Sequence, residues 1–153
     1  MSRTRWISIM TVLLLWATPL FAAELTPEET VKKYLAAFKE GNFRAAYPFV
    51  SKSMAQNKSE EDWAKEQQWI MQMAEAKVFD YKVFPGKVEG DKAYVPNVLN
   101  SQDKFLNQLG VVEHELYTLI KEDGNWKINQ QQIVEPGDVS KWFPADATSS
   151  KTE

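Results

Sequence analysis

The sequence predicts an α+β domain in which three N-terminal helices pack on the concave face of a curved antiparallel sheet. Two observations support this fold class. Apolar residues recur at helical spacing up to Ala74 and at alternating spacing from Phe79 onward. Turn residues such as Asp123 and Gly124 separate the alternating segments, as they do in β-hairpins. With this element order the helices must cover one face of the sheet, and the twist of the sheet makes that face concave.

The first 22 residues predict a signal peptide. Arg3 and Arg5 precede an apolar run over residues 9–16, and small residues follow at Ala22 and Ala23. A transmembrane anchor is the alternative, but crossing about 30 Å of hydrocarbon takes roughly 20 mainly apolar residues. A Thr-Pro pair interrupts the segment before that length is reached. We therefore expect cleavage after Ala22 or Ala23, no stable membrane anchor afterwards, and a periplasmic or secreted protein.

The remaining length of about 130 residues suits a single domain, which we place at residues 24–144. Residues 145–153 are small and polar, and we expect a disordered tail there. The sequence has no cysteine, so no disulfide supports the fold and no thiol carries a lipid. Cleavage would remove Arg3 and Arg5, which leaves 16 of the 18 basic residues against 21 acidic ones. This acidic balance argues against nucleic acid and anionic lipid as partners.

Two helices are expected before residue 51. A capping box that begins at Thr26 starts the first helix, and Gly41 offers its left-handed stop. Asn42 can cap a second helix, which Pro48 keeps short or kinked because proline lacks a backbone donor. The apolar face of the first helix consists of Val31, Tyr34, Leu35 and Phe38.

A third helix is expected to begin at Ser59, which opens a second capping pattern. Its apolar side is interpreted as part of the core rather than as a cofactor site, the usual role of an amphipathic helix. Trp69 lies near the margin of that side, where it could serve an interface. The residues expected to face the core are Trp63, Gln67, Ile70, Met71 and Ala74.

The first part of the sheet combines alternating residues with turn residues. Residues 89–92 predict a tight turn, and residues 93–99 a further strand in which Pro96 marks an edge or a bulge. Residues 101–110 fit a short helix, which we favour, or a long hairpin loop. One face of the strand before the turn carries Phe79, Tyr81 and Val83.

The last hairpin has the strongest sequence pattern of the sheet. Residues 111–121 form one strand, a turn follows at Asp123 and Gly124, and residues 126–134 return antiparallel. In the tail beyond this hairpin, we expect Trp142 and Phe143 to dock on the domain.

Four segments of this chain resemble those of a known superfamily: PEETVKKYL (27–35), GNFRAAY (41–47), EGDKAYV (89–95) and LIKEDGNWKI (119–128). On these segments the chain from Thr26 to Val134 resembles the nuclear-transport-factor-2-like superfamily, which has the cystatin-like fold, and especially its small exported bacterial members. The resemblance implies a cone-shaped pocket between helices and sheet. Members use that pocket for isomerisation, dehydration, ligand binding or protein docking, so the fold does not choose an activity. No segment matches the catalytic motifs of the ketosteroid isomerases of this superfamily.

The last hairpin provides the candidate ligand site. With the turn placed as above, Tyr117 faces Gln130 and Glu115 faces Gln132. A small apolar chamber with a few convergent polar groups is how ligand pockets are usually built. The alternative is a solvated strand end, and a register slip of one residue would exchange the two faces. The candidate ligand-binding residues are Glu115, Tyr117, Trp126, Gln130 and Gln132, next to an apolar floor that also includes Leu119 and Ile128.

Metal, nucleophile and phosphate sites are disfavoured by composition. His114 is the only histidine and the sequence has no cysteine, so neither a zinc site nor a nucleophile dyad can be completed around it. The sequence has no Gly-rich phosphate loop. We therefore assign no metal, no cofactor and no catalytic residue from the sequence.

The sequence supports two functions of different classes. The first is a non-enzymatic exported domain that binds a small apolar ligand or a partner protein in the cone. The alternative is a pocket enzyme of isomerase or dehydratase type, with Glu115 or Asp80 as base and Tyr117 or Tyr94 as donor. That alternative requires a carboxylate inside the cone within hydrogen-bond reach of a tyrosine.

A homodimer is also expected, because the other face of the last hairpin looks too apolar to remain in water. That face carries Val112, His114, Leu116, Thr118 and Ile120.

Overall fold

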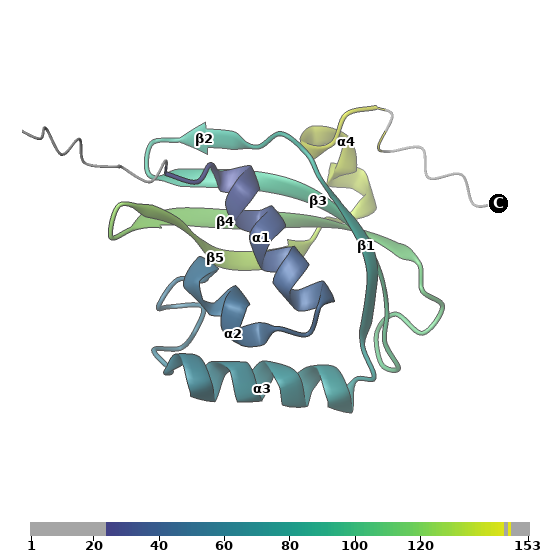
Figure 1. Cartoon of the computed structure of the whole chain (residues 1–153). Helices are drawn as coiled ribbons and strands as arrows, with labels where there is room; N and C mark the ends of the chain where they lie inside the picture. The colour runs from purple at the N-terminus through teal and green to yellow at the C-terminus, as the bar shows by residue number, and fades with distance from the viewer. Residues whose placement is uncertain (1–23, 146, 148–153) are drawn as a thin grey trace, which may run out of the picture.

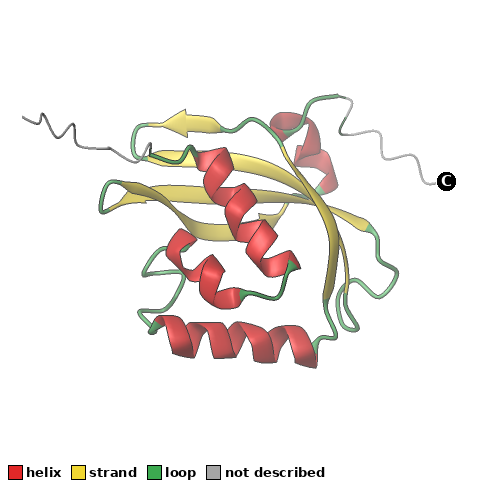
Figure 2. Ribbon diagram, in the orientation of Figure 1, coloured by secondary structure: helices red, strands yellow, loops and turns green. Residues whose placement is uncertain are grey.

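The computed structural model describes residues 24–145 and Ala147, which form a layer of helices on one face of a five-stranded antiparallel sheet (Figure 1). Figure 2 shows the helices of this layer on one face of the sheet, and in chain order they all precede the strands, which confirms the expected fold class. The expected signal peptide lies outside the described residues, as do residues 146 and 148–153 of the expected tail. The helical elements are α1 (Pro27–Lys39), α2 (Phe43–Ala46), η1 (Tyr47–Phe49), α3 (Glu60–Met73), η2 (Pro136–Asp138) and α4 (Val139–Trp142).

The start of α1 is fixed by the predicted capping box. The Thr26 backbone N–H donates to Glu29 Oε2 at 2.8 Å, and the Glu29 N–H donates to Thr26 Oγ1 at 3.2 Å. Gly41 has a φ of +68° after the helix, which is the left-handed stop that the sequence indicated. Asn42 Oδ1 accepts the Ala45 N–H and caps α2, which gives way to the 3₁₀ turn η1.

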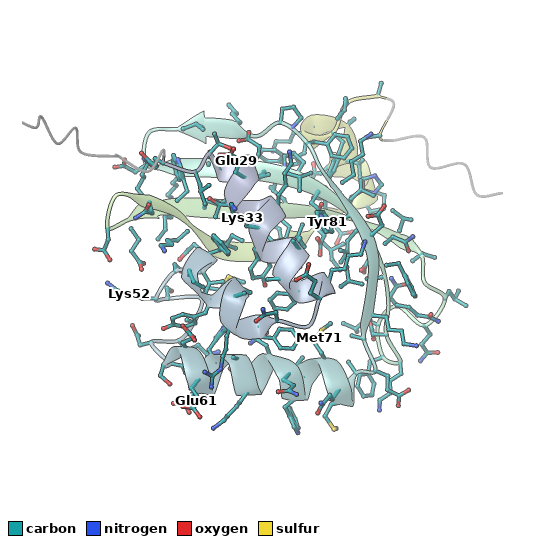
Figure 3. The ribbon with its side chains drawn as sticks, viewed as in Figure 1. Glu29, Lys33, Lys52, Glu61, Met71 and Tyr81 are labelled. Atoms are coloured by element: carbon teal, nitrogen blue, oxygen red, sulfur yellow. The ribbon has the colours of Figure 1, made fainter. Side chains whose placement is uncertain are left out.

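The predicted core face of α3 is only partly correct. Trp63 is buried, but Ile70 is 44% exposed, and so its assignment to the core was wrong. The reason is that α3 packs on α2 and η1 rather than on the sheet, which leaves its C-terminal half uncovered. Trp69 is 61% exposed, in agreement with its expected place at the helix margin. Figure 3 shows Glu61 on the side of α3 that faces away from the sheet and Met71 on the side that faces it.

The sheet has the strand order β1-β3-β4-β5, and β2 also pairs with β3. Pro96 lies in β3 at the point where its neighbour changes from β2 to β1, so its missing N–H interrupts neither pairing. The strands are β1 (Lys77–Val83), β2 (Lys87–Glu89), β3 (Lys92–Gln102), β4 (Val112–Glu122) and β5 (Asn125–Ile133).

A β-bulge in β1 changes which residues face the helices. The register shifts between Val78 and Asp80, so Phe79 has no partner on β3. Phe79 is therefore 46% exposed, whereas Val78 and Tyr81 pack against the core. The prediction that Phe79 shares a face with Tyr81 was wrong, because the alternation of side chains restarts at the bulge.

Residues 103–110 form a loop, and the short helix that we favoured there was wrong. The Asp103 carboxylate accepts the backbone N–H groups of Phe105, Leu106 and Asn107. The buried Asn107 amide donates to the carbonyls of Ser101 and Val111. These local side-chain hydrogen bonds replace the backbone bonds that a helix would make.

The C-terminal segment covers part of the outer face of the sheet. Phe143 is buried against Leu116 and Phe84, and its ring contacts the His114 ring with 4.8 Å between centroids. Trp142 packs on Tyr94, so the predicted docking pair of Trp142 and Phe143 is confirmed. The apolar face that we expected to remain bare is thus partly covered by the chain itself.

Candidate functional site

A cavity of about 160 Å³ lies between α1 and the concave face of the sheet, at the end where β1 begins and β3 ends. This space between the helices and the concave face is here called the cone. Its other end, near the β4–β5 turn, is filled by fully buried side chains such as Leu119 and Ile128. The cavity is lined by Tyr34, Leu35, Phe38, Met71, Ala76, Lys77, Val78, Leu99, Ser101, Gln102, Asp103, Tyr117 and Gln131.

A buried carboxylate lies just behind the polar wall of this cavity. Glu115 is 3% exposed and accepts hydrogen bonds from three neutral donors. Asn97 Nδ2 lies 2.9 Å and Tyr117 Oη 3.1 Å from Glu115 Oε2. Gln131 Nε2 lies 2.7 Å from Glu115 Oε1. The donors come from β3, β4 and β5, and two of them, Tyr117 and Gln131, also line the cavity.

Burial dominates the electrostatics of this network. It raises the pKa of Glu115, and the nearby Glu113 carboxylate adds to the rise, although the three hydrogen bonds oppose it. Burial also raises the pKa of Tyr117, and the Glu115 charge pushes it further. The pKa of Tyr34 is raised for the same two reasons, burial first. Both phenols are therefore neutral donors near physiological pH, and Glu115 holds a proton more tightly than an exposed glutamate does.

Asn97 leaves one polar atom of the network without a partner. Its side chain is fully buried opposite Glu115 in the β3–β4 ladder. Asn97 Oδ1 has no hydrogen-bond partner among the described residues, whereas its Nδ2 is held by Glu115. An unpaired buried acceptor is unfavourable, so the network has room for one more donor.

The register of the last hairpin differs from the prediction by one residue. Tyr117 pairs with Gln131 and Glu115 pairs with Ile133, because a bulge at Asn129 shifts the ladder. Gln130 and Gln132 consequently point away from Glu115 and are exposed, and they hydrogen-bond to each other at 3.2 Å.

The bulge has a visible tertiary cause. Ser51 is fully buried, and its N–H donates to the Ile128 carbonyl at 2.8 Å. Its hydroxyl donates to Asn129 Oδ1, also at 2.8 Å. Ser51 therefore holds the edge of β5 in the position where the extra residue is accommodated.

The other candidate residues are divided between the cone and the surface. Trp126 is buried but does not line the cavity. Asp80 is exposed and pairs with Lys39 at 3.5 Å. Tyr94 packs on Trp142 at the outer face, so neither it nor Asp80 joins Glu115. Among the proposed base and donor residues, the structure brings together only Glu115 and Tyr117.

Sequence reasoning missed three residues of the site: Tyr34, Asn97 and Gln131. The helical spacing assigns Tyr34 only to the apolar face of α1. Asn97 had a detectable signal, since it is the polar member of an otherwise apolar alternation with Val95 and Leu99 in β3. Gln131 carried no such signal, because its orientation depends on the bulge.

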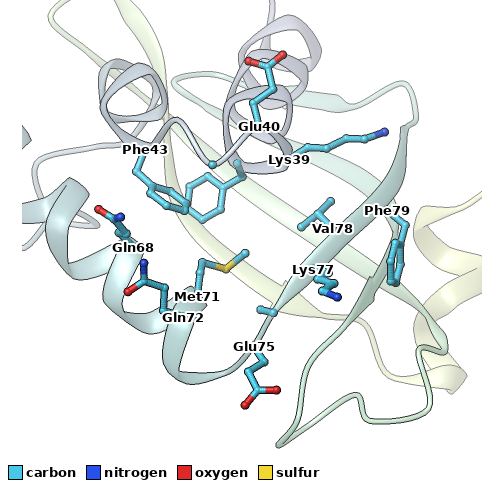
Figure 4. Close-up of a pocket in the computed structure, with 13 residues that line it drawn as sticks. Lys39, Glu40, Phe43, Gln68, Met71, Gln72, Glu75, Lys77, Val78 and Phe79 are labelled. Atoms are coloured by element: carbon cyan, nitrogen blue, oxygen red, sulfur yellow. The ribbon is translucent and has the colours of Figure 1, made fainter.

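A second, more open hollow of about 780 Å³ adjoins the cavity and shares Phe38, Met71 and Val78 with it. Figure 4 shows it between the C-terminal half of α3, the end of α1 and the start of β1, with Met71 pointing into it. Charged side chains such as Lys39 and Glu75 lie around it. The cone is thus reached from a wide outer hollow, with the smaller cavity deeper inside.

Within residues 24–145 and Ala147, no three histidine or acidic side chains gather as metal ligands would. No helix among these residues is long and apolar enough to cross a membrane.

No protein-family model matches the chain, and no curated protein matches its sequence. Solved structures do match. A SEC-C motif containing protein from Rhodopseudomonas palustris is 14% identical with a TM-score of 0.55, over 72% of this chain and 80% of that one. A protein provisionally assigned as a ketosteroid isomerase, from Shewanella frigidimarina, is 19% identical with a TM-score of 0.51, over 71% of this chain and 95% of that one.

A nuclear-transport-factor-2-like protein of unknown function from Cytophaga hutchinsonii is 14% identical with a TM-score of 0.47, over 78% of this chain and 98% of that one. At such identities structural similarity shows the fold alone. The chain has the nuclear-transport-factor-2-like, or cystatin-like, fold that its sequence motifs indicated.

The raised pKa of Glu115 predicts a specific dependence of stability on pH. The folded state binds this proton more tightly than the unfolded state, whose glutamate has the ordinary value of 4.5. The stability that Glu115 contributes is therefore fully present below pH 4.5 and is lost as the pH rises through the raised folded pKa. The variant Glu115→Gln cannot titrate, so wild type should lose stability relative to it over that range.

Urea denaturation of both proteins at a series of pH values measures this difference. Glu89→Gln is the matched control, because Glu89 is exposed on β2, and its profile should follow wild type. Parallel profiles for wild type and Glu115→Gln would show that Glu115 titrates normally.

Proposed function

We propose that this domain binds a small molecule with an apolar body and a polar group in the cavity of the cone. The observation that carries this proposal is the asymmetry of the cavity wall. Phe38, Val78 and Leu99 provide apolar surface, whereas Tyr117 and Gln131 present polar groups that Glu115 holds in place. Such a wall, mostly apolar with a few fixed polar groups, is typical of ligand sites.

The volume limits the size of the molecule. A dry cavity of about 150 Å³ is large enough for benzene, and the inner cavity here is of similar size, about 160 Å³. A larger ligand can extend through the shared wall of Phe38, Met71 and Val78 into the outer hollow. The inner cavity would then hold the group that is recognised.

An isomerase or dehydratase is the second candidate, and one observation favours it. A carboxylate does lie inside the cone within hydrogen-bond reach of a tyrosine, since Tyr117 Oη is 3.1 Å from Glu115 Oε2. The similarity to the Shewanella protein fits this candidate as well. Against it, Glu115 does not line the cavity, so Gln131 would have to move before Glu115 could act as a base. Following a retained compound by NMR for chemical change separates an enzyme from a binding protein.

Filling the cavity should abolish ligand retention. Val78→Phe places a larger side chain at the wall between cavity and outer hollow, whereas Val88→Phe makes the same change on β2, where Val88 is 54% exposed. After incubation with host-cell extract, native mass spectrometry should show an added mass on wild type and on Val88→Phe, and none on Val78→Phe. Wild-type protein that stays at its bare mass would contradict the proposal.

We further propose that the protein is exported and that residues 1–22 are removed. Two contacts at the start of the domain are made by residues that follow the proposed cleavage sites: Thr26 caps α1, and Glu24 pairs with Lys121. Cleavage after Ala22 or Ala23 would leave both contacts intact. N-terminal sequencing of the protein from its host should begin at Ala23 or Glu24, in the periplasmic or secreted fraction. A membrane-bound product that begins at Met1 or Ser2 would overturn this proposal.

We also propose a homodimer, although the C-terminal segment covers part of the apolar face through which we expected the two chains to pack. Leu116 and His114 are covered by the C-terminal segment, and the apolar side chains still exposed include Leu106 and Leu109 of the β3–β4 loop. Exposed apolar residues of this kind often mark contacts between chains. Light scattering of the purified protein should return twice the monomer mass, and a monomer mass at high protein concentration would rule the dimer out.

A further inference from the structure

The buried charge of Glu115 has no cationic partner. The ion pairs between described side chains join surface lysines to exposed or half-buried carboxylates, and none of them includes Glu115. Its hydrogen-bond donors are two amides and a phenol, which are all neutral. The charged side chain that affects its pKa is another carboxylate, Glu113, which raises it. Buried carboxylates are usually paired with a cation or a metal. Glu115 has no such partner among the described residues.

The groups between Glu115 and the cavity are suited to receive a donor. Tyr117 and Gln131 each use a hydrogen to bind Glu115, which leaves the Tyr117 oxygen and the Gln131 carbonyl as acceptors. Tyr34 lines the same cavity, and its ring lies edge-on to Tyr117 with 6.1 Å between centroids. With Phe38, whose ring is 4.6 Å from that of Tyr34, these rings form an aromatic wall. Aromatic faces attract cations.

The other charged side chains around the cavity do not change its preference for a cationic group over an anionic one. Asp103 lines it, but its carboxylate is held by three backbone N–H groups. Lys77 lines it from β1 and is exposed, so water screens its charge. Glu113 lies two residues from Glu115 on the same face of β4. The field inside the cavity therefore comes mainly from the carboxylates of β4, and it disfavours an anion.

We infer that the ligand of the cone carries a protonated amine on a flat apolar body of about the size of benzene. The ammonium group lies against Tyr117 and Gln131 and compensates the charge of Glu115, and the body fills the aromatic part of the cavity. This inference rests on the proposed function, because it names the chemical class of the molecule that the cone binds. Gln131 is exposed enough to swing away, which lets the ammonium reach Glu115 Oε1 directly.

Two probes of nearly equal shape test the inference: benzylamine, which is cationic at neutral pH, and benzyl alcohol, which is not. Wild type should bind benzylamine about tenfold more tightly, a modest gain for opposite charges a few ångströms apart in a partly buried site. Glu115→Gln should remove that preference, so that the two probes bind this variant with similar affinity. Glu89→Gln changes the net charge equally at a distant exposed site and should keep the preference.

A second measurement does not depend on how well Glu115→Gln folds. The pKa of Glu115 in wild type can be followed by carbon-13 NMR of its carboxyl group, and saturating benzylamine should lower it because a nearby cation favours the charged form. Benzyl alcohol should not lower it. Equal affinity for both probes, or a pKa that benzylamine does not move, would overturn the amine inference and leave the proposed binding function standing. Failure of wild type to bind benzylamine would likewise overturn the amine inference, whereas the binding function is tested separately by the mass retained from host-cell extract.

Discussion

The arrangement of the cone depends on how Glu115 is accommodated. A carboxylate that is almost fully buried is tolerated only when hydrogen bonds replace its water, and here each of three adjacent strands supplies one donor: Asn97 from β3, Tyr117 from β4 and Gln131 from β5. The network therefore fixes the register of the three strands relative to one another. It also requires the bulge at Asn129, because without it Gln131 would point to the other face.

This requirement divides the cone into two parts. Toward the β4–β5 turn, Leu119, Ile128 and Val31 are fully buried and leave no space. Toward the other end, polar side chains replace apolar ones on the same strand faces. There α3 packs on α2 instead of on the sheet. A cavity forms where close packing ends and the polar network begins. The stable part of the fold and the part suited to binding thus occupy opposite ends of one layer.

The apolar side chains on the outer face of the sheet are shielded from water by a different segment of the chain. There the chain covers itself, since η2 and α4 return across the sheet and place Phe143 on Leu116. The helical layer and the C-terminal segment together enclose both faces of β4, the central strand of the site. Six of the large apolar side chains that remain exposed lie on the C-terminal half of α3 and on the loop of residues 103–110. An ion pair between Lys104 and Glu75 joins this loop to the end of α3.

The sequence by itself determined the fold class, the helix caps at Thr26 and Asn42, the turn at Asp123, and the place of Glu115 and Tyr117 on one strand face, because each follows from local hydrogen bonds or from strict alternation. Only the tertiary structure decided which side chains of β1 and β5 face the cone. The bulge at Asn129 arises with a contact to Ser51, distant in sequence, and a single inserted residue reverses the alternation beyond it. For the same reason Gln131, rather than Gln130 or Gln132, became the partner of the buried carboxylate.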